Sequence, residues 1–317
     1  MEHWWQNTFP DGRKTLTVTE SNGKVIQISY GEKGQGPPLI LFHGIGSWSY
    51  SWRKLIALLA QQFRVICFDA KGHGFSAGGE IAREIGYQVP EFIQIVRQLG
   101  NNQPVLVMAQ SLGALITLAA AEAEPQLFSH LILINVPIFI ETLPNWWMPF
   151  IANIPISFIQ GIDNLRLSKT LAPLIQKGVA YLRREVVVDP QTITPEDVAA
   201  ITYPYIEFPG AIATYANDLQ LGLRALTAKA QNRPNLMTQV EENLDKILQP
   251  TLILWGDRDR WFPRYLGDLL YQNLQNSDFK ILNQCGHDAA ATAPAQIYQE
   301  LQQFFQKYPY SSINPQI

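Results

Sequence analysis

The most constraining feature of the sequence is a sharp turn around Ser111, which joins an apolar strand to an apolar helix. Residues 104–108 form a short run rich in Val and Leu, which predicts a buried strand, and residues 114–123 have the composition and spacing of a buried helix. A turn this tight strains its central residue and requires small residues two positions away on each side, which are Ala109 and Gly113. The Ser111 hydroxyl would then project from the positive end of the helix, as in a nucleophile elbow. The same pentapeptide also fits a serine that only caps a helix.

The rest of the chain alternates between expected strands and helices. Two alternating segments around Asn22-Gly23 predict a hairpin within residues 14–30. Further strands are expected at 39–42, 64–68, 131–135, 250–255 and 279–282, and helices at 50–63, 89–99, 264–274 and 294–308. Because the strands are apolar on both faces, we predict an α/β fold with a mostly parallel sheet and helices on both sides.

The alternation stops between about residues 137 and 228, where the sequence has helical segments but no convincing strand. We therefore expect a helical cap, residues 138–228, inserted after the sixth strand. Residues 1–137 and 229–317 would form the core domain, and the last residues, 311–317, are expected to be frayed.

Composition excludes several classes of function. The net charge of −3 gives no reason to expect a nucleic-acid surface. The only two cysteines, Cys67 and Cys285, fall in or beside expected buried strands, so we predict no disulfide framework and a reducing compartment. The five histidines are scattered without the spacing of metal ligands, so no metal is expected. The N-terminus lacks the pattern of a signal peptide, and no apolar run reaches the roughly 20 residues of a membrane span, which together predict a cytoplasmic protein.

Polar residues follow three of the expected strands. Ser111 follows the elbow strand, Asp257 and Asp259 follow the strand at 250–255, and His287 follows the last strand. Ligands of an open parallel sheet lie at the carboxyl ends of its strands, so we expect these loops to meet. In that arrangement His287 would take the Ser111 proton and a carboxylate would orient the imidazole. Chain order Ser, Asp, His is the order of a triad on such a sheet.

A fourth loop, His43-Gly44-Ile45-Gly46, leaves the strand at 39–42. Its glycines would let the backbone approach a substrate closely. The amides of Ile45 and Leu112 are the predicted oxyanion hole, where loss of one donor typically raises the barrier by about 3 kcal/mol. His43, Asp69 and His73 are predicted to organise their loops rather than to catalyse.

These motifs together resemble the α/β-hydrolase superfamily, in its cap-bearing Ser-Asp-His branch of esterases and lipases. The resemblance covers residues 14–308 and depends on His43-Gly44-x-Gly46, Asp69-x-x-Gly72-x-Gly74-x-Ser76, Ala109-x-Ser111-x-Gly113, Gly256-x-x-Asp259-x-x-x-Pro263 and Gly286-His287. It implies that Asp259, rather than Asp257, is the acid of the triad, and that no cofactor is required. A serine nucleophile argues against the dehalogenases and epoxide hydrolases of the family, which use Asp at this place.

The expected activity is hydrolysis of a carboxylic ester, with an apolar small molecule as substrate. The cap residues Trp146, Trp147 and Phe150 would line its pocket, and the cap could also touch a membrane surface; the same residues could instead form the interface between cap and core. A weaker resemblance, over residues 34–76 and especially 43–53, is to chlorophyll and pheophytin dephytylases.

Two alternatives remain open. A carbon–carbon hydrolase or lyase resembling the menaquinone-pathway type would need an arginine-bearing pocket, for which Arg166, Arg183 and Arg184 are available. A non-catalytic receptor would keep its function without Ser111. The motifs leave the oligomeric state open between monomer and homodimer.

Overall fold

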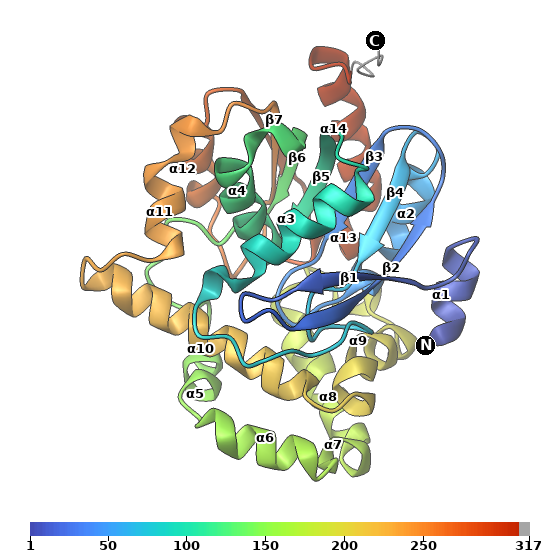
Figure 1. Ribbon diagram of the computed structural model, residues 1–317, viewed down its shortest axis with the longest axis vertical. Coiled ribbons are helices and arrows are strands. Elements are labelled where there is room, and N and C mark those ends of the chain that lie inside the picture. The colour runs from blue at the N-terminus through green and yellow to red at the C-terminus, as the bar shows by residue number, and fades with distance from the viewer. Residues whose placement is uncertain (311–317) are drawn as a thin grey trace.

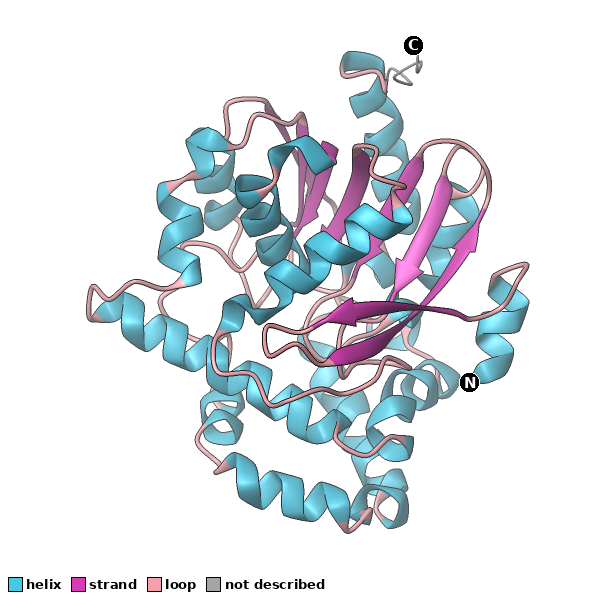
Figure 2. Ribbon diagram, viewed as in Figure 1, coloured by secondary structure: helices cyan, strands magenta, loops and turns pink. Residues whose placement is uncertain are grey.

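The computed structural model describes residues 1–310, and the expected fraying of residues 311–317 lies outside the described residues. Eight strands form one sheet in the order β1-β2-β4-β3-β5-β6-β7-β8, in which the pairs β1–β2 and β2–β4 are antiparallel and all others parallel (Figures 1 and 2). The strands are β1 (Lys14–Thr19), β2 (Val25–Lys33), β3 (Pro38–Phe42), β4 (Arg64–Phe68), β5 (Val105–Gln110), β6 (Phe128–Ile134), β7 (Thr251–Gly256) and β8 (Ser277–Leu282). The hairpin predicted at Asn22-Gly23 joins β1 to β2, with Thr19 opposite Val25.

Helices cover both faces of the sheet and make up the insertion after β6. Those of the core are α1 (Glu2–Thr8), α2 (Arg53–Leu59), α3 (Gln88–Leu99), α4 (Leu112–Ala123), α11 (Leu236–Glu242), α12 (Tyr265–Asn273), α13 (Ala289–Thr292) and α14 (Pro294–Lys307). Those after β6 are α5 (Trp147–Ala152), α6 (Ile156–Asn164), α7 (Leu167–Thr170), α8 (Ala172–Leu182), α9 (Pro195–Glu207) and α10 (Ala211–Ala230).

The strands separate two hydrophobic cores because successive side chains point to opposite faces. On β3, Ile40 and Phe42 face the core under α3, α4, α11 and α12, whereas Leu39 and Leu41 face the core under α1, α2, α13 and α14. Every residue of β5 is buried, as expected for a central strand covered on both sides. This double covering fixes the end of β5, and with it the position of Ser111.

The insertion after β6 is helical, as its sequence predicts. In Figure 1, α5, α6 and α7 lie at one end of the molecule with α10 above them, and α8 overlaps α10 in this view. Asp163 on α6 accepts from the Ala213 amide of α10 over 3.2 Å, and Gln220 of α10 donates to the Ile154 carbonyl over 2.7 Å. Because α10 passes residue 228 and ends at Ala230, it belongs to both parts of the chain, and the division into core and cap stays a proposal.

Two features at the N-terminal side differ from the sequence expectation. The helix α1 was not predicted; it buries Trp5 completely, packed against Phe9 and Trp48. The expected helix at 50–63 is instead a 3₁₀ turn, Ser49–Trp52, followed by the shorter α2. Residues 60–63 leave the helix and pack their backbone on Gly34, where a β-carbon would lie 2.4 Å from the Phe63 carbonyl oxygen.

Among residues 1–310, no helix combines the length and the apolar character needed to cross a membrane.

Candidate active site

Ser111 lies in the strained turn that its neighbours predict. Its backbone has φ 54° and ψ −127°, between the last residue of β5 and the first of α4. A β-carbon at Gly113 would lie 2.5 Å from the His43 carbonyl oxygen, so only glycine allows the helix to start this close to the neighbouring loop. The Ser111 amide donates to the Ile134 carbonyl over 2.9 Å, which anchors the turn to β6.

The structure brings Ser111, His287 and Asp259 together from three loops. The distance from Ser111 Oγ to His287 Nε2 is 3.1 Å, and that from His287 Nδ1 to Asp259 Oδ2 is 2.8 Å. The Asp259 side chain is fully buried, and its Oδ1 accepts from the amides of Trp261 and Phe262 over 2.8 and 3.0 Å. These two bonds fix the orientation of the carboxyl group, so that Asp259 can hold the Nδ1 proton and leave Nε2 free to accept the serine proton.

Asp257, the other candidate acid, does not contact the histidine ring. Its Oδ1 accepts from the Cys285 amide over 3.0 Å, so the side chain ties the loop after β7 to the loop after β8. Asp257 therefore has the role of a loop residue, as the family resemblance implies.

The loop after β3 lies directly beside Ser111. A β-carbon on Gly44 would be 2.8 Å from Ser111 Cβ, so the backbone at Gly44 can pass this close to the nucleophile only because it has no side chain. Ile45 lines the same cavity as Ser111, and Leu112 is the first residue of α4. Within residues 1–310, the hydrogen bonds of loops and caps include none from the Ile45 or Leu112 amide, so both N–H groups are available to a ligand oxygen.

Two buried amide side chains that the sequence analysis did not identify fix the histidine loop. Asn135, at the end of β6, donates to the carbonyls of His287 (2.9 Å) and Gly286 (3.3 Å). Gln110, next to Ser111, donates to the His287 carbonyl over 3.2 Å and accepts from the Ala290 amide over 3.1 Å. Both residues hold the backbone of His287 against the elbow.

His43, Asp69 and His73 organise the neighbouring loops, as predicted. His43 Nε2 accepts from the Ala70 amide over 3.0 Å, and burial lowers the pKa of His43 to about 3. Asp69 accepts from the amides of Ser49 (2.8 Å) and Phe75 (2.7 Å), while burial raises the pKa of its carboxyl group to about 6. None of the three lines the cavity at Ser111.

The cavity above Ser111 has a volume of about 370 Å³ and a mostly apolar wall. Its floor is formed by Gly44, Ile45, Gln110, Ser111 and His287, and its walls include Trp147, Ile151, Ile175, Val179, Leu182, Val186, Ile201, Ile212, Tyr205, Tyr215 and Trp261. Among the described residues that line it, Arg183 and Asp288 carry opposite charges and form an ion pair with each other. The Trp261 ring lies 4.8 Å from the His287 ring and shields it from water.

Of the three predicted pocket residues, only Trp147 lines this cavity. Trp146 and Phe150 are 83% and 69% exposed on the outside of the molecule, which corrects the expectation for these two. The physical reason is the phase of α5: Trp147 and Ile151 are four residues apart on the face toward the cavity, whereas Trp146 and Phe150 lie four residues apart on another face.

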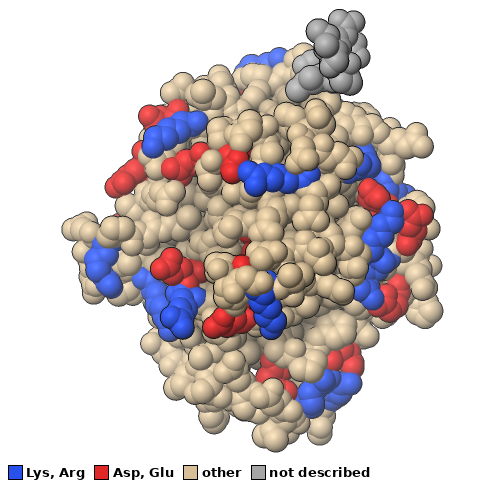
Figure 3. Space-filling model, viewed as in Figure 1, with Lys and Arg blue, Asp and Glu red and all other residues tan. Residues whose placement is uncertain are grey.

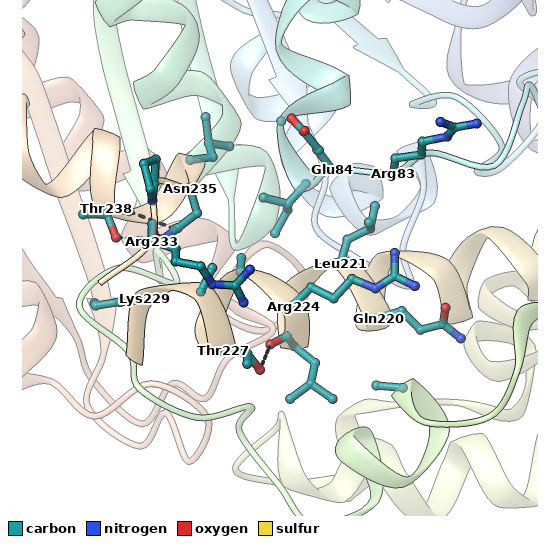
Figure 4. Close-up of a pocket in the computed structure, with 18 of the residues that line it drawn as sticks. Arg83, Glu84, Gln220, Leu221, Arg224, Thr227, Lys229, Arg233, Asn235 and Thr238 are labelled. Carbon is teal, nitrogen blue, oxygen red and sulfur yellow. Dashed lines mark hydrogen bonds between the residues drawn. The ribbon is translucent and has the colours of Figure 1, made fainter. Parts of the chain in front are cut away.

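A second and larger groove, of about 1540 Å³, lies between α10, α11 and residues 83–86. Figure 4 shows its polar lining, with Arg224 and Lys229 from α10, Arg233 and Asn235 beside α11, and Glu84 opposite. None of the described residues that line it is a histidine, serine or cysteine, so it lacks the Ser–His or Cys–His pair of a nucleophilic hydrolase. The smaller cavity at Ser111 is therefore the candidate active site.

Among residues 1–310, no three His, Cys, Asp or Glu side chains are grouped so that they could hold a metal ion.

Comparisons with known proteins agree with this architecture. The family model described as alpha/beta hydrolase fold matches residues 37–294. An uncharacterized hydrolase of Bacillus subtilis is 28% identical over 282 residues, which are 87% of this chain and 93% of the relative. A monoacylglycerol lipase of Mus musculus is 23% identical over 92% of this chain and 81% of its own length. The solved structure of a thermophilic esterase from Thermogutta terrifontis superposes with a TM-score of 0.68 at 18% identity, over 93% of this chain and 98% of that one.

Proposed function

Since the chain belongs to the alpha/beta hydrolase fold family, we propose that it is a serine hydrolase that cleaves carboxylic esters of apolar molecules. The observation that carries the proposal is the hydrogen-bonded series Ser111–His287–Asp259 at the floor of an apolar cavity. In this proposal Ser111 is the nucleophile, His287 the general base and acid, and Asp259 its orienting partner.

The proposed reaction has two halves. Ser111 Oγ attacks the ester carbonyl carbon while its proton passes to His287 Nε2, and the carbonyl electron pair moves onto the oxygen. The C–O bond to the alcohol then breaks, and His287 returns its proton to the leaving alkoxide, which leaves an acyl-serine. Water, deprotonated by His287, attacks the acyl carbon; the acid departs and Ser111 recovers its proton. The amides of Ile45 and Leu112 would stabilise the negative oxygen in both halves.

The composition of the cavity wall favours an apolar ester with few polar atoms as the substrate. Three buried donors in the wall, Trp147 Nε1, Tyr205 Oη and Trp261 Nε1, have no hydrogen-bond partner among the described residues. All three atoms are buried within the wall, so the surface that a bound ligand meets is mostly apolar. Such a surface favours the apolar part of an ester. The lipase and esterase activities named for the mouse relative and the Thermogutta structure are consistent with this choice.

The arginines give less support to an acidic substrate, which the carbon–carbon hydrolase alternative requires. Arg183 lines the cavity but its charge is already paired with Asp288. Arg166 donates to the Glu207 carbonyl, and Arg184 lies over the Tyr181 ring on the outer surface. No unpaired cation is thus directed into the cavity from the described residues.

Hydrolysis of p-nitrophenyl esters of increasing acyl length by wild type and Ser111→Ala tests the proposal. We expect wild type to release p-nitrophenol and the variant to lose at least about 10³-fold in kcat. The acyl length with the highest kcat/KM measures the usable depth of the cavity. Turnover that survives in Ser111→Ala would overturn the assignment of the nucleophile. If wild type shows no turnover, the carbon–carbon and receptor alternatives take precedence.

A further inference from the structure

The outer surface of α5 to α8 exposes an unusual number of large apolar side chains. Nine of the fourteen such residues exposed among residues 1–310 lie between positions 146 and 181: Trp146, Phe150, Phe158, Ile162, Leu165, Leu167, Leu171, Leu174 and Tyr181. We call these nine residues the outer apolar face. Exposed apolar residues are ordinary when scattered singly, but a concentration on neighbouring elements marks an interaction surface.

Helical spacing shows that this exposure is organised. On α6, Phe158 and Ile162 lie on one helix face and are exposed, as is Leu165 directly after the helix. Ile159 and Asp163 face α10 and are buried. The helix α8 is mostly apolar in sequence, yet none of its eleven residues is buried. A helix that is apolar around most of its circumference normally lies within a core or in contact with lipid.

On α5 and α8, the outer apolar face is the reverse side of the cavity wall. On α8, Ile175, Val179 and Leu182 line the cavity at Ser111, while Leu174 and Tyr181 point outward at 66% and 67% exposure. The same division holds on α5, as described above. A surface bound to the outer face would therefore be separated from the active-site cavity by a single layer of helices.

The charges around this face favour a negative partner. Residues 144–188 contain five Lys or Arg and two acidic residues, and two of the cations, Lys169 and Arg183, are paired with Glu207 and Asp288. One of the acidic residues, Asp163, is buried. Lys177, on the same side of α8 as Leu174 and Tyr181, and Arg184, in the 3₁₀ turn after α8, are exposed and take part in no ion pair among residues 1–310. The Arg184 guanidinium lies over the Tyr181 ring. Figure 3 shows that the end of the molecule where α6 and α7 lie carries few charged side chains, with cations and anions gathered above and beside it.

We propose that the outer apolar face docks onto a membrane surface that contains anionic lipids. The apolar side chains would enter the boundary between head groups and acyl chains, and Lys177 and Arg184 would remain at the level of the lipid phosphates. A second copy of the chain fits less well, because a two-fold interface places the same patch on itself and would bring these unpaired cations toward each other. The inference concerns the outside of the cap and does not depend on the ester proposal.

Flotation with vesicles tests the docking without any substrate. The full chain would be mixed with vesicles of phosphatidylcholine alone or of phosphatidylcholine and phosphatidylglycerol at 7:3. We expect wild type to float with the anionic vesicles at low salt and to be released as salt rises. The double variants Phe158→Ser/Leu165→Ser and Lys177→Gln/Arg184→Gln should each bind at least about tenfold more weakly.

A matched control separates this surface from apolar exposure in general. The double variant Val25→Ser/Leu248→Ser removes two side chains of similar exposure, 59% each, at sites outside the cap, and should bind like wild type. Thermal unfolding of each variant checks that it remains folded. The proposal fails if wild type does not float with anionic vesicles, if it binds neutral vesicles equally well, or if Phe158→Ser/Leu165→Ser binds like wild type. Sedimentation that shows a dimer lost in that variant, without vesicle binding, would instead identify the face as a subunit interface.

Discussion

The side-chain amide of Asn135 donates a hydrogen bond to the backbone carbonyl of His287 over 2.9 Å. The same side chain accepts from the Gly256 amide over 3.0 Å through its Oδ1, so one residue at the end of β6 joins the last residue of β7 to the histidine loop. Asn135 is fully buried and has φ 48°, a conformation that asparagine tolerates better than most residues. Two of the three loops that carry the proposed triad are thus held at a fixed distance by a residue that cannot itself react.

We expect Asn135→Ala to lower both stability and activity. It removes the donors to the carbonyls of Gly286 and His287 and leaves the Gly256 amide unpaired, at a cost of about 2–4 kcal/mol in the free energy of unfolding. Displacement of His287 should lower kcat for a short ester more than it raises KM. Urea unfolding and steady-state kinetics measure the two effects. Asn276→Ala is the control, because Asn276 makes one exposed bond to the Leu248 carbonyl; a loss as large as that of Asn135→Ala would contradict the prediction.

Substitution of the two aspartates after β7 distinguishes the orienting acid from the loop residue. Asp259→Asn keeps the shape of the side chain but places an amide against His287 Nδ1, which favours the wrong tautomer; we expect kcat to fall by about 10³–10⁴-fold. Asp257→Asn retains an oxygen that can accept from Cys285, and its kcat should stay within about threefold of wild type. Equal losses in the two variants would contradict the assignment.

The positions of Ser111, Asp259 and His287 could be predicted because each follows a strand that the sequence marks clearly, and parallel strands end at the same edge of a sheet. The contacts of Asn135 and Gln110 with the His287 loop could not be predicted, because these hydrogen bonds join residues more than 150 positions apart. Nothing in the local sequence of either residue specifies such a partner. The family match then confirmed the fold inferred from the motifs.

Which side of each short cap helix faces the cavity could not be predicted from the sequence either. Trp146 and Trp147 are adjacent and chemically identical, and only the phase of α5 decides that Trp147 lines the cavity. The pairing of Arg183 with Asp288 is also a contact between distant parts of the chain, so the arginine appeared available to an acidic substrate until the structure placed its partner.

The two neighbouring tryptophans provide a matched pair for the cavity. Trp147→Ala removes a wall of the cavity and an unpaired donor, so we expect kcat/KM for the best p-nitrophenyl ester to fall by about 10–100-fold and the preferred acyl chain to lengthen. Trp146→Ala removes an exposed ring and should leave these constants unchanged. The prediction is contradicted if the acyl-length profiles of both variants match that of wild type.

Gly44 is expected to tolerate no side chain. In Gly44→Ala the new β-carbon would lie 2.8 Å from Ser111 Cβ and 3.2 Å from the Gln110 carbonyl oxygen, so the loop must move away from the nucleophile. We predict at least about a 10²-fold loss in kcat, because the Ile45 amide moves with the loop. Gly78→Ala is the control, since a β-carbon at Gly78 meets nothing within 4 Å. Ester kinetics of the two variants check the prediction, and unchanged kcat in Gly44→Ala would contradict it.

Because His43 is buried, its contribution to the free energy of unfolding should fall as the pH is lowered. Burial, with a smaller contribution from the neighbouring His73, lowers the pKa of His43 from 6.5 to about 3, so the folded protein keeps this ring neutral where the unfolded chain protonates it. As the pH falls from 6.5 toward 3, the unfolded state binds one more proton, and His43 alone lowers the free energy of unfolding by up to about 1.4 kcal/mol per pH unit. Asp69 acts in the opposite sense between pH 6 and 3.8, because its folded pKa is raised to about 6.

Comparison with His43→Gln isolates the histidine from this opposing effect. Glutamine can still accept from the Ala70 amide and donate to the Gly44 carbonyl, as His43 does, but it does not titrate. Asp69 is present in both proteins, so its contribution cancels in their difference. We therefore expect wild type to be the more stable protein at pH 7, and its advantage over the variant to shrink steadily as the pH is lowered to 4. Urea unfolding of both proteins at half-unit intervals measures this difference, and an advantage that stays constant across the range would show that His43 is protonated in the folded state.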